Sequence, residues 1–240
     1  MSRMLRAGVV ALLGLLAAAA HGDEADIRKA LQGKFRETPL ESVSKTPFNG
    51  IYEVVVGGRI LYTDEKATFI FIGNLLDLRG GAERDLTEER TSQIASQALK
   101  QSVDLAIKRV RGNGKRVLYT FEDPNCGWCK KFHGELAKVN NVTIYTFLWP
   151  ILSPDSVEKA KMVWCARDRV KAWDDVMIRG SVQMQDAGKG CDTPIEKNLQ
   201  LAKRFGARGT PAVYIADGRQ IGGYVTADKL EEALGSVPAK

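Results

Sequence analysis

The stretch VLYTFEDPNCGWCKKFHGELAKV, residues 117–139, decides the fold of this 240-residue chain. An apolar run, residues 117–121, predicts a strand, and residues 130–139 predict a helix. Between them stands the pair Cys126 and Cys129, at the start of the predicted helix. Backbone N–H groups and the helix dipole stabilise a thiolate at such a position, and a thiolate is the nucleophile of disulfide exchange. The pattern therefore favours a redox dithiol.

The same cysteine spacing also supplies half of a structural zinc site, which needs about four Cys or His ligands. The other candidate ligands are Cys165, Cys191, His133 and His21, the last of them close to a predicted leader. Because so few ligands remain, the redox interpretation is preferred over the metal one. We expect neither a metal nor a cofactor.

The N-terminus has the pattern of a secretory signal peptide, residues 1–20. Arg3 and Arg6 precede an apolar stretch of small residues that is too short for an ordinary membrane span. We expect cleavage after Ala20 or Gly22, and an uncleaved anchor is the alternative. The full chain carries a net charge of +6. No block of like charges accompanies this excess, so we expect no nucleic-acid partner.

Export changes how the four cysteines are interpreted, because an oxidising compartment permits disulfides. Four cysteines allow three pairings, and Cys126–Cys129 with Cys165–Cys191 is the natural one. The second pair would close a loop of about 26 residues, which contributes roughly 3–4 kcal/mol in the chain-entropy model. We therefore expect it to be a structural disulfide.

The N-terminal part predicts a short helix followed by a small sheet. Apolar residues favour one helix face between residues 23 and 35, and Pro39 and Pro47 bracket an extended connection. Strands are expected at residues 51–56, 60–63 and 67–72, with a Gly57-Gly58 hairpin turn and a possible fourth strand at 75–78. Such a sheet has a thin core, so pairing with a second copy is expected.

A long helix is expected next. Asp85 and Glu88 resemble a capping box, and apolar residues recur at helical spacing without Gly or Pro as far as Arg111. Gly112-Asn113-Gly114 is a suitable stop. We interpret this helix as the linker between two domains, and a core helix of one larger domain is the alternative.

The second half predicts a strand, helix and strand, then a helix-rich polar region, residues 153–205, and finally two strands and a helix. A βαβ unit followed by a ββα unit is the thioredoxin pattern, here with a helical insertion. In that pattern the segment Gly209-Thr210-Pro211 before the strand 212–216 is informative, because the thioredoxin fold places a cis proline there, packed against the dithiol.

These motifs occur in an order that resembles the periplasmic disulfide isomerases of the DsbC/DsbG type, and most closely DsbC, over nearly the whole mature chain. The resemblance implies an α+β protein. Its expected parts are a cystatin-like N-terminal dimerisation domain (21–82), a linker helix (83–112) and a thioredoxin-fold catalytic domain (113–240) with the insertion at about 150–205. Family members are V-shaped homodimers whose cleft binds misfolded substrates.

The resemblance also assigns roles to residues. Cys126 would attack a substrate disulfide and Cys129 would resolve the mixed disulfide. Thr210 and Pro211 would present backbone to an extended substrate segment. Trp128 would contact substrate or merely cover the dithiol.

Several neighbouring residues are expected to have no part in the chemistry. His133 is expected to be an ordinary solvated helix residue. Glu122 and Asp123 are interpreted as solvated loop carboxylates rather than as a proton relay. The tryptophans at 149, 164 and 173 are expected in the core.

The sequence thus predicts a thiol:disulfide interchange enzyme of the periplasm. We expect a homodimeric isomerase that acts on misfolded disulfide-containing exported proteins and is kept reduced by a DsbD-type membrane reductant. Two alternatives remain: a DsbG-like thiol reductase with narrow clientele, and a dimeric periplasmic chaperone.

Overall fold

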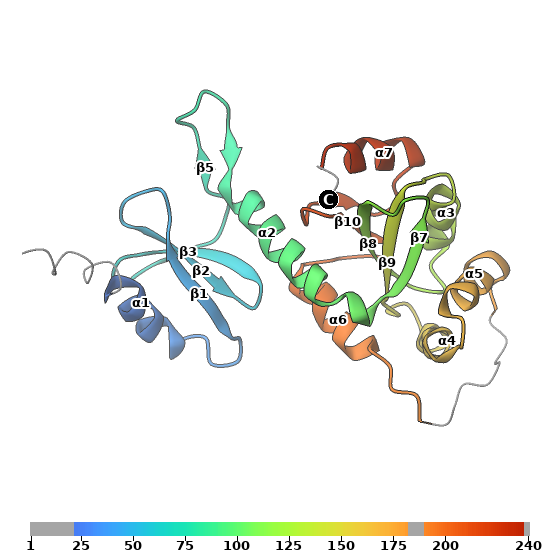
Figure 1. The fold of residues 1–240 in the computed structure, drawn as a ribbon. Helices are drawn as coiled ribbons and strands as arrows, with labels where there is room; N and C mark the ends of the chain where they lie inside the picture. Colours follow the sequence, from blue (N-terminus) through green and yellow to red (C-terminus); the bar gives the residue numbers. More distant parts are fainter. Residues whose placement is uncertain (1–21, 182–189, 238–240) are drawn as a thin grey trace, which may run out of the picture. The chain divides into compact units, whose positions relative to one another are not determined.

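The computed structural model describes residues 22–181 and 190–237, so the predicted signal peptide lies outside the described residues. The chain forms two compact units, residues 1–73 and 74–240, and each is described by itself (Figure 1). The second unit begins at residue 74, nine residues before the boundary expected between residues 82 and 83. None of the described helices is long and apolar enough to cross a membrane.

The first unit is one helix packed on a four-stranded antiparallel sheet. Its elements are α1 (Gly22–Gln32), β1 (Leu40–Lys45), β2 (Ile51–Val56), β3 (Arg59–Asp64) and β4 (Ile70–Phe71), with the strands in that order across the sheet. Ile27 and Leu31 of α1 are buried against Val54 and Leu61 of the sheet. The Gly57-Gly58 turn is confirmed, with positive φ at both residues. The segment expected to be merely extended before Pro47 forms β1.

The second unit opens with a two-stranded hairpin, β5 (Leu76–Asp77) and β6 (Arg84–Asp85), followed by helix α2 (Leu86–Gln101). The cap of α2 is as predicted, since the Asp85 carboxylate accepts a hydrogen bond from the N–H of Glu88 at 2.9 Å. The predicted C-terminal end of this helix, at Arg111, is wrong. The helix stops at Gln101, and residues 107–111 form strand β7.

Strand β7 forms because residues 107–111 pair with a neighbouring strand, which the local sequence does not reveal. They pair antiparallel with β9, from Ile107 opposite Thr146 to Arg111 opposite Val142. Ile107 is buried and Lys108 is exposed. Helix α2 is therefore shorter than the linker helix expected at residues 83–112.

A five-stranded sheet is the frame of the second unit, in the order β11-β10-β8-β9-β7. The bounds are β7 (Ile107–Arg111), β8 (Arg116–Glu122), β9 (Val142–Leu148), β10 (Ala212–Ile215) and β11 (Gln220–Gly222). Strands β8 and β9 are parallel, and the other pairs are antiparallel. The expected βαβ and ββα units are present.

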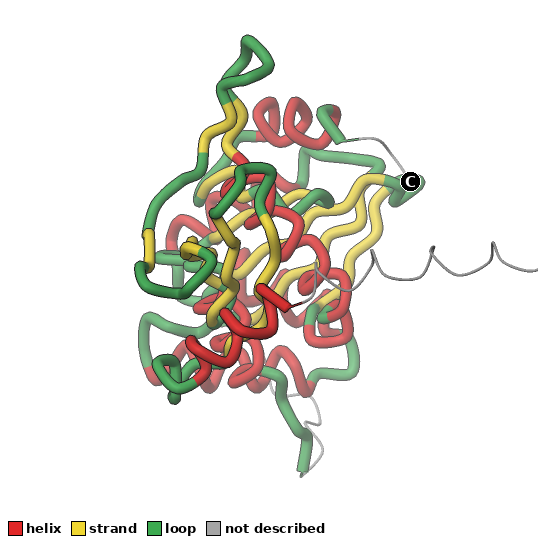
Figure 2. The backbone as a smooth tube through the Cα atoms, turned by 90° about the vertical axis from the view of Figure 1, so that its left-hand side faces the viewer, coloured by secondary structure: helices red, strands yellow, loops and turns green. Residues whose placement is uncertain are grey.

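Helices pack on both faces of this sheet, and Figure 2 shows the helices and strands of the chain in a view turned by 90° from Figure 1. On one face, α3 (Gly127–Leu136) and α7 (Ala227–Gly235) bury apolar side chains with strands β8, β9 and β10. On the other face, α2 and α6 (Ile195–Arg204) pack around a stack of aromatic rings. Phe121 and Phe147 lie at its centre, with ring centroids 4.7 Å apart.

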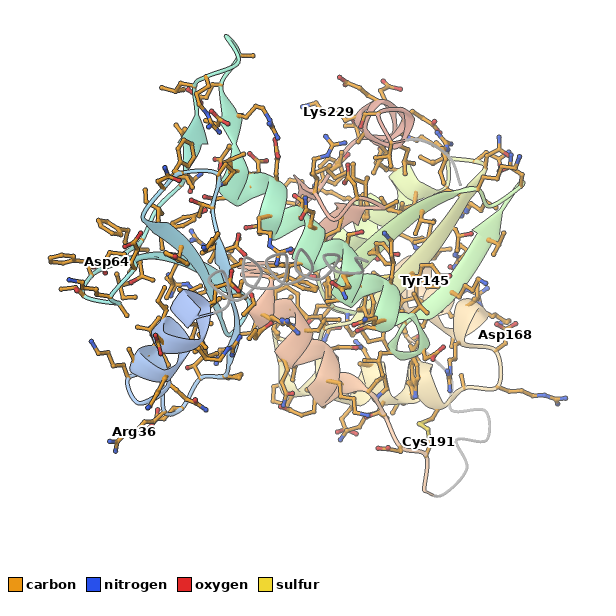
Figure 3. All side chains as sticks on the ribbon, turned by 60° about the vertical axis from the view of Figure 1, so that its left-hand side comes forward. Arg36, Asp64, Tyr145, Asp168, Cys191 and Lys229 are labelled. Atoms are coloured by element: carbon orange, nitrogen blue, oxygen red, sulfur yellow. A yellow bond between two sulfur atoms is a disulfide. The ribbon has the colours of Figure 1, made fainter. Side chains whose placement is uncertain are left out.

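The insertion contributes two further helices, α4 (Pro154–Cys165) and α5 (Arg169–Arg179), which pack beside the cysteine pair. A disulfide joins Cys165, at the end of α4, to Cys191, which precedes α6 and is labelled in Figure 3. The three tryptophans expected in the core are at most 6% exposed.

Helix α2 lies against the turn between β10 and β11. Gly218 in that turn has φ +90°, and a Cβ built on it would stand 1.9 Å from the carbonyl oxygen of Ser92 in α2. The Ser96 hydroxyl donates a hydrogen bond to the carbonyl of Ala216 at 2.8 Å. Only glycine fits at this contact, which attaches α2 to the sheet.

Candidate active site

The cysteine pair lies where a central strand meets a helix. Strand β8 ends at Glu122, three residues form a loop, and Cys126 is the N-cap of α3. Its Sγ accepts a hydrogen bond from the N–H of Cys129 at 3.4 Å. A helix N-terminus presents unpaired N–H groups and a partial positive charge, which stabilise a thiolate at this position. Both cysteines are free thiols in this structure.

Thr210 and Pro211 complete the site from the segment before β10. The Thr210–Pro211 bond is cis. The Cys126 thiol donates to the carbonyl oxygen of Thr210 at 3.1 Å, and the Thr210 hydroxyl lies 2.9 Å from the Sγ of Cys129. The structure therefore brings together four of the predicted site residues: the two cysteines, and the Thr210-Pro211 segment that follows them by more than 80 positions in the sequence.

The two thiols differ in their surroundings. Cys126 retains 5% exposure, whereas Cys129 is fully buried. Burial raises the pKa of the Cys129 thiol, and the carboxyl group of Glu122 raises it further. Cys126 is thus the more exposed of the two thiols.

Glu122 and Asp123 are buried, so the expectation that they are solvated is wrong. Glu122 is 1% exposed, and neither of its carboxyl oxygens has a hydrogen-bond partner among the described residues. Burial raises the pKa of this carboxyl to about 7, although Thr120 and the charge of Arg109 act in the opposite direction. The length of the strand could have indicated this burial, because a central strand that runs to residue 122 is covered on both faces.

Comparison with known proteins assigns the family. A model described as "Disulfide bond isomerase protein N-terminal domain" matches residues 18–88, and one described as "Thioredoxin-like domain" matches residues 103–238. The probable thiol:disulfide interchange protein DsbC of Bordetella parapertussis is 41% identical over 209 residues, which are 87% of this chain and 73% of that protein. The chain belongs to the DsbC family.

More distant relatives agree. The thiol:disulfide interchange protein DsbC of Escherichia coli K12 is 28% identical over 227 residues, or 93% of this chain and 92% of the relative. A disulfide interchange protein from Neisseria gonorrhoeae has a crystal structure that covers 58% of this chain and 99% of its own, with 40% identity and a TM-score of 0.53. The predicted α+β class and thioredoxin-like domain are confirmed, and the protein is a thiol:disulfide interchange enzyme.

Within this DsbC-family site, Trp128 is exposed. The residue is 56% exposed, and its ring centroid lies 5.4 Å from that of Tyr224. The Nζ of Lys131 lies 4.4 Å from the centroid of the Trp128 ring. A cation over an aromatic ring is a favourable contact. Tyr224, which the sequence did not single out, thus belongs to the rim of the site.

His133 is not the solvated residue that was expected. Its side chain is 13% exposed, and its Nε2 lies 3.2 Å from a carboxylate oxygen of Asp174 in α5. Burial lowers the pKa of this histidine, and the opposing influence of Asp174 is smaller. Arg109 also pairs with Asp174. His133 therefore links α3 to the insertion.

A metal site was the alternative role predicted for the cysteine pair of this DsbC-family chain. Among residues 22–181 and 190–237, no group of three or more His, Cys, Asp or Glu side chains could hold a metal ion.

Proposed function

We propose that this DsbC-family enzyme is a periplasmic protein-disulfide isomerase, with Cys126 as nucleophile and Cys129 as resolving thiol. The observation that carries the proposal is the asymmetry of the pair. Cys126 caps a helix and retains 5% exposure, whereas Cys129 is fully buried and has a raised pKa. An accessible, stabilised thiolate can enter a wrong disulfide, and a buried partner acts only when the first product persists.

The exchange conserves electrons. The Cys126 thiolate attacks one sulfur of a substrate disulfide, a new S–S bond forms, and the other substrate sulfur leaves as a thiolate that takes a proton. In isomerisation, a substrate thiolate then attacks the mixed disulfide, which forms the correct bond and releases Cys126 reduced. In reduction, Cys129 attacks instead, and the enzyme becomes oxidised while the substrate gains two thiols.

Thr210, Pro211 and Trp128 are proposed to bind the substrate chain next to the scissile disulfide. The backbone carbonyl of Thr210 already accepts a hydrogen bond from the Cys126 thiol, so a substrate sulfur that reaches Cys126 would lie beside this segment. The substrates would be misfolded exported proteins with disulfides. A DsbD-type membrane protein would keep Cys126 reduced, and residues 1–20 would direct export.

Assembly as a homodimer is proposed through the first unit. Strand β4 lies at the edge of the four-stranded sheet, with Phe69 62% exposed, Phe71 54% and Ile72 73%. An exposed apolar edge strand offers both unpaired backbone groups and apolar area to a second copy. The unit also has a small core of its own, which such a partner would enlarge.

The test is recovery of activity from a scrambled substrate with several disulfides, in a glutathione buffer, with the mature protein and its Cys126→Ala variant. Rescue that requires Cys126 supports the isomerase. No rescue, with insulin disulfides still reduced, would overturn isomerisation in favour of a narrow reductase. Suppression of aggregation that survives in Cys126→Ala, together with rescue that also survives, would favour a chaperone.

A further inference from the structure

Asp123 is a fully buried carboxylate whose four acceptor positions are all used. One oxygen accepts hydrogen bonds from the N–H of Asn125 and the hydroxyl of Ser156, both at 2.8 Å. The other accepts from the N–H groups of Ile151 and Leu152, at 2.8 and 2.9 Å. Each carboxyl oxygen therefore accepts two hydrogen bonds, which together fix the side chain in place.

The backbone of the same residue is bonded to the reactive centre. The N–H of Asp123 donates to the hydroxyl of Thr210 at 3.0 Å, and its carbonyl oxygen accepts from the N–H of Cys126 at 3.1 Å. Asp123 therefore joins three segments that are far apart in sequence: the loop before the nucleophile, the cis-proline segment, and residues 150–153.

The third segment carries apolar side chains that the fold leaves uncovered. Ile151 is 42% exposed and Leu152 is 54% exposed, although the backbone of both is fixed by Asp123. They line a shallow hollow together with Pro150, Pro154 and Val157. Exposed apolar side chains in such a cluster, next to a reactive group, indicate a contact surface.

We propose that Asp123 is a positioning residue for disulfide exchange: its carboxylate holds residues 150–153 so that Ile151 and Leu152 form an apolar contact surface beside Cys126. The occupant is the polypeptide that flanks a substrate cystine, because the surface adjoins the loop before Cys126, where the Asn125 side-chain amide donates a hydrogen bond to the Ser153 hydroxyl at 3.2 Å. The inference rests on the proposed function and adds a preference for apolar residues near the cystine.

An aspartate suits this role better than its amide. Asparagine has one acceptor oxygen, and its NH₂ group would face donors, so an Asp123→Asn variant keeps only half of the bonds. Either the link to α4 through Ser156 or the link to Ile151 and Leu152 is lost. Buried donors left without an acceptor destabilise that arrangement, and the segment moves away from its position.

The test compares two disulfide substrates: a peptide disulfide with leucines flanking the cystine, and glutathione disulfide, which is too small to span the surface. The readout is the ratio of kcat/KM for the peptide to kcat/KM for glutathione disulfide. For an Ile151→Ser, Leu152→Ser double variant we expect this ratio to fall about tenfold, from partial loss of two apolar contacts. Asp123→Asn is expected to lower the same ratio, mainly through KM for the peptide.

The matched control is Val110→Ser, an apolar side chain that is 55% exposed on β7. Val110 pairs with Thr143 near the start of β9, whereas β8 delivers the dithiol from its far end, so this site is remote from Cys126. The ratio is expected to stay at the wild-type value. Should Asp123→Asn fail to fold, the double variant still tests the contact surface, because its side chains are exposed.

Two outcomes would overturn the inference. An unchanged kcat/KM ratio in the double variant would show that Ile151 and Leu152 do not contact the substrate. An equal loss of kcat/KM with both substrates in Asp123→Asn would show that Asp123 has only a structural role. The proposed function fails differently, through a wild-type protein that exchanges neither disulfide with dependence on Cys126.

Discussion

Replacement of Glu122 by glutamine should make the stability of the catalytic unit less dependent on pH. The carboxyl is 1% exposed and without a hydrogen-bond partner among the described residues. Its pKa rises from 4.5 to about 7 because burial disfavours the charged form. The folded state therefore holds the proton more tightly than the unfolded state does.

This difference has a definite sign. Below about pH 4.5 the carboxyl is protonated in both states and there is no penalty. As the pH rises towards 7, the unfolded state loses its proton first, so the free energy of unfolding falls. At about 1.4 kcal/mol per pH unit, the full loss is about 3 kcal/mol above pH 7. A glutamine cannot ionise, so Glu122→Gln should avoid this loss.

The assay is urea unfolding of the reduced protein at pH 4 to 8, followed by tryptophan fluorescence at fixed protein concentration. All four tryptophans lie in residues 74–240, so the signal reports on the catalytic unit. The cost of burying an amide is the same at every pH, so only the pH-dependent part is compared. Between pH 4 and pH 8, the stability of Glu122→Gln relative to wild type should rise by about 3 kcal/mol.

Glu135 supplies the control, because its shift has the opposite sign. The hydrogen bond from Lys138 lowers the pKa of that carboxyl, so its contribution is present above the unfolded pKa and is lost as the pH falls. Glu135→Gln should therefore be relatively less stable at neutral pH than in acid. If the difference between Glu122→Gln and wild type stayed constant within about 0.5 kcal/mol across this range, the argument from burial would be refuted.

Three other predictions concern the thiols, the disulfide and the sheet edge. Cys129→Ala should accumulate a mixed disulfide with substrate, seen by mass spectrometry under nonreducing conditions, whereas Cys126→Ala should not, because Cys129 is buried; equal trapping by both would contradict the assigned roles. Replacement of both Cys165 and Cys191 by alanine removes a disulfide between cysteines 26 positions apart. It should lower the free energy of unfolding, measured in urea, by about 3–4 kcal/mol. An unchanged free energy of unfolding would contradict a structural role for this disulfide. Phe71→Lys should convert dimer to monomer in sedimentation, whereas Val110→Lys, which changes a side chain of nearly equal exposure, should leave the dimer intact.

The sequence was most informative where local chemistry and chain order agree. Strand β9 matches the expected residues 142–148, and α3 begins at the cysteine pair. The failures arise from long-range contacts. Residues 107–111 contain no Gly or Pro that would predict the end of the helix, yet pairing with β9 makes them a strand. Local patterns contain no information about such a partner.

The site shows the same division. The dithiol and the Thr210-Pro211 segment could be predicted because motif and order identify them. Asp123 could not be, since its importance comes from bonds to residues 151, 152 and 156, which approach only in the folded chain. His133 was misjudged for a similar reason, because its partner Asp174 lies on a helix of the insertion.

The contact at Gly218 has a consequence for the mutational tolerance of this protein. In sequence, Asp217-Gly218 is an ordinary hairpin turn, a kind of site that usually accepts substitutions and insertions. Here the helix backbone of Ser92 occupies the space that any side chain would need. The turn and the helix can therefore change only together, so a surface turn is as constrained as a core position.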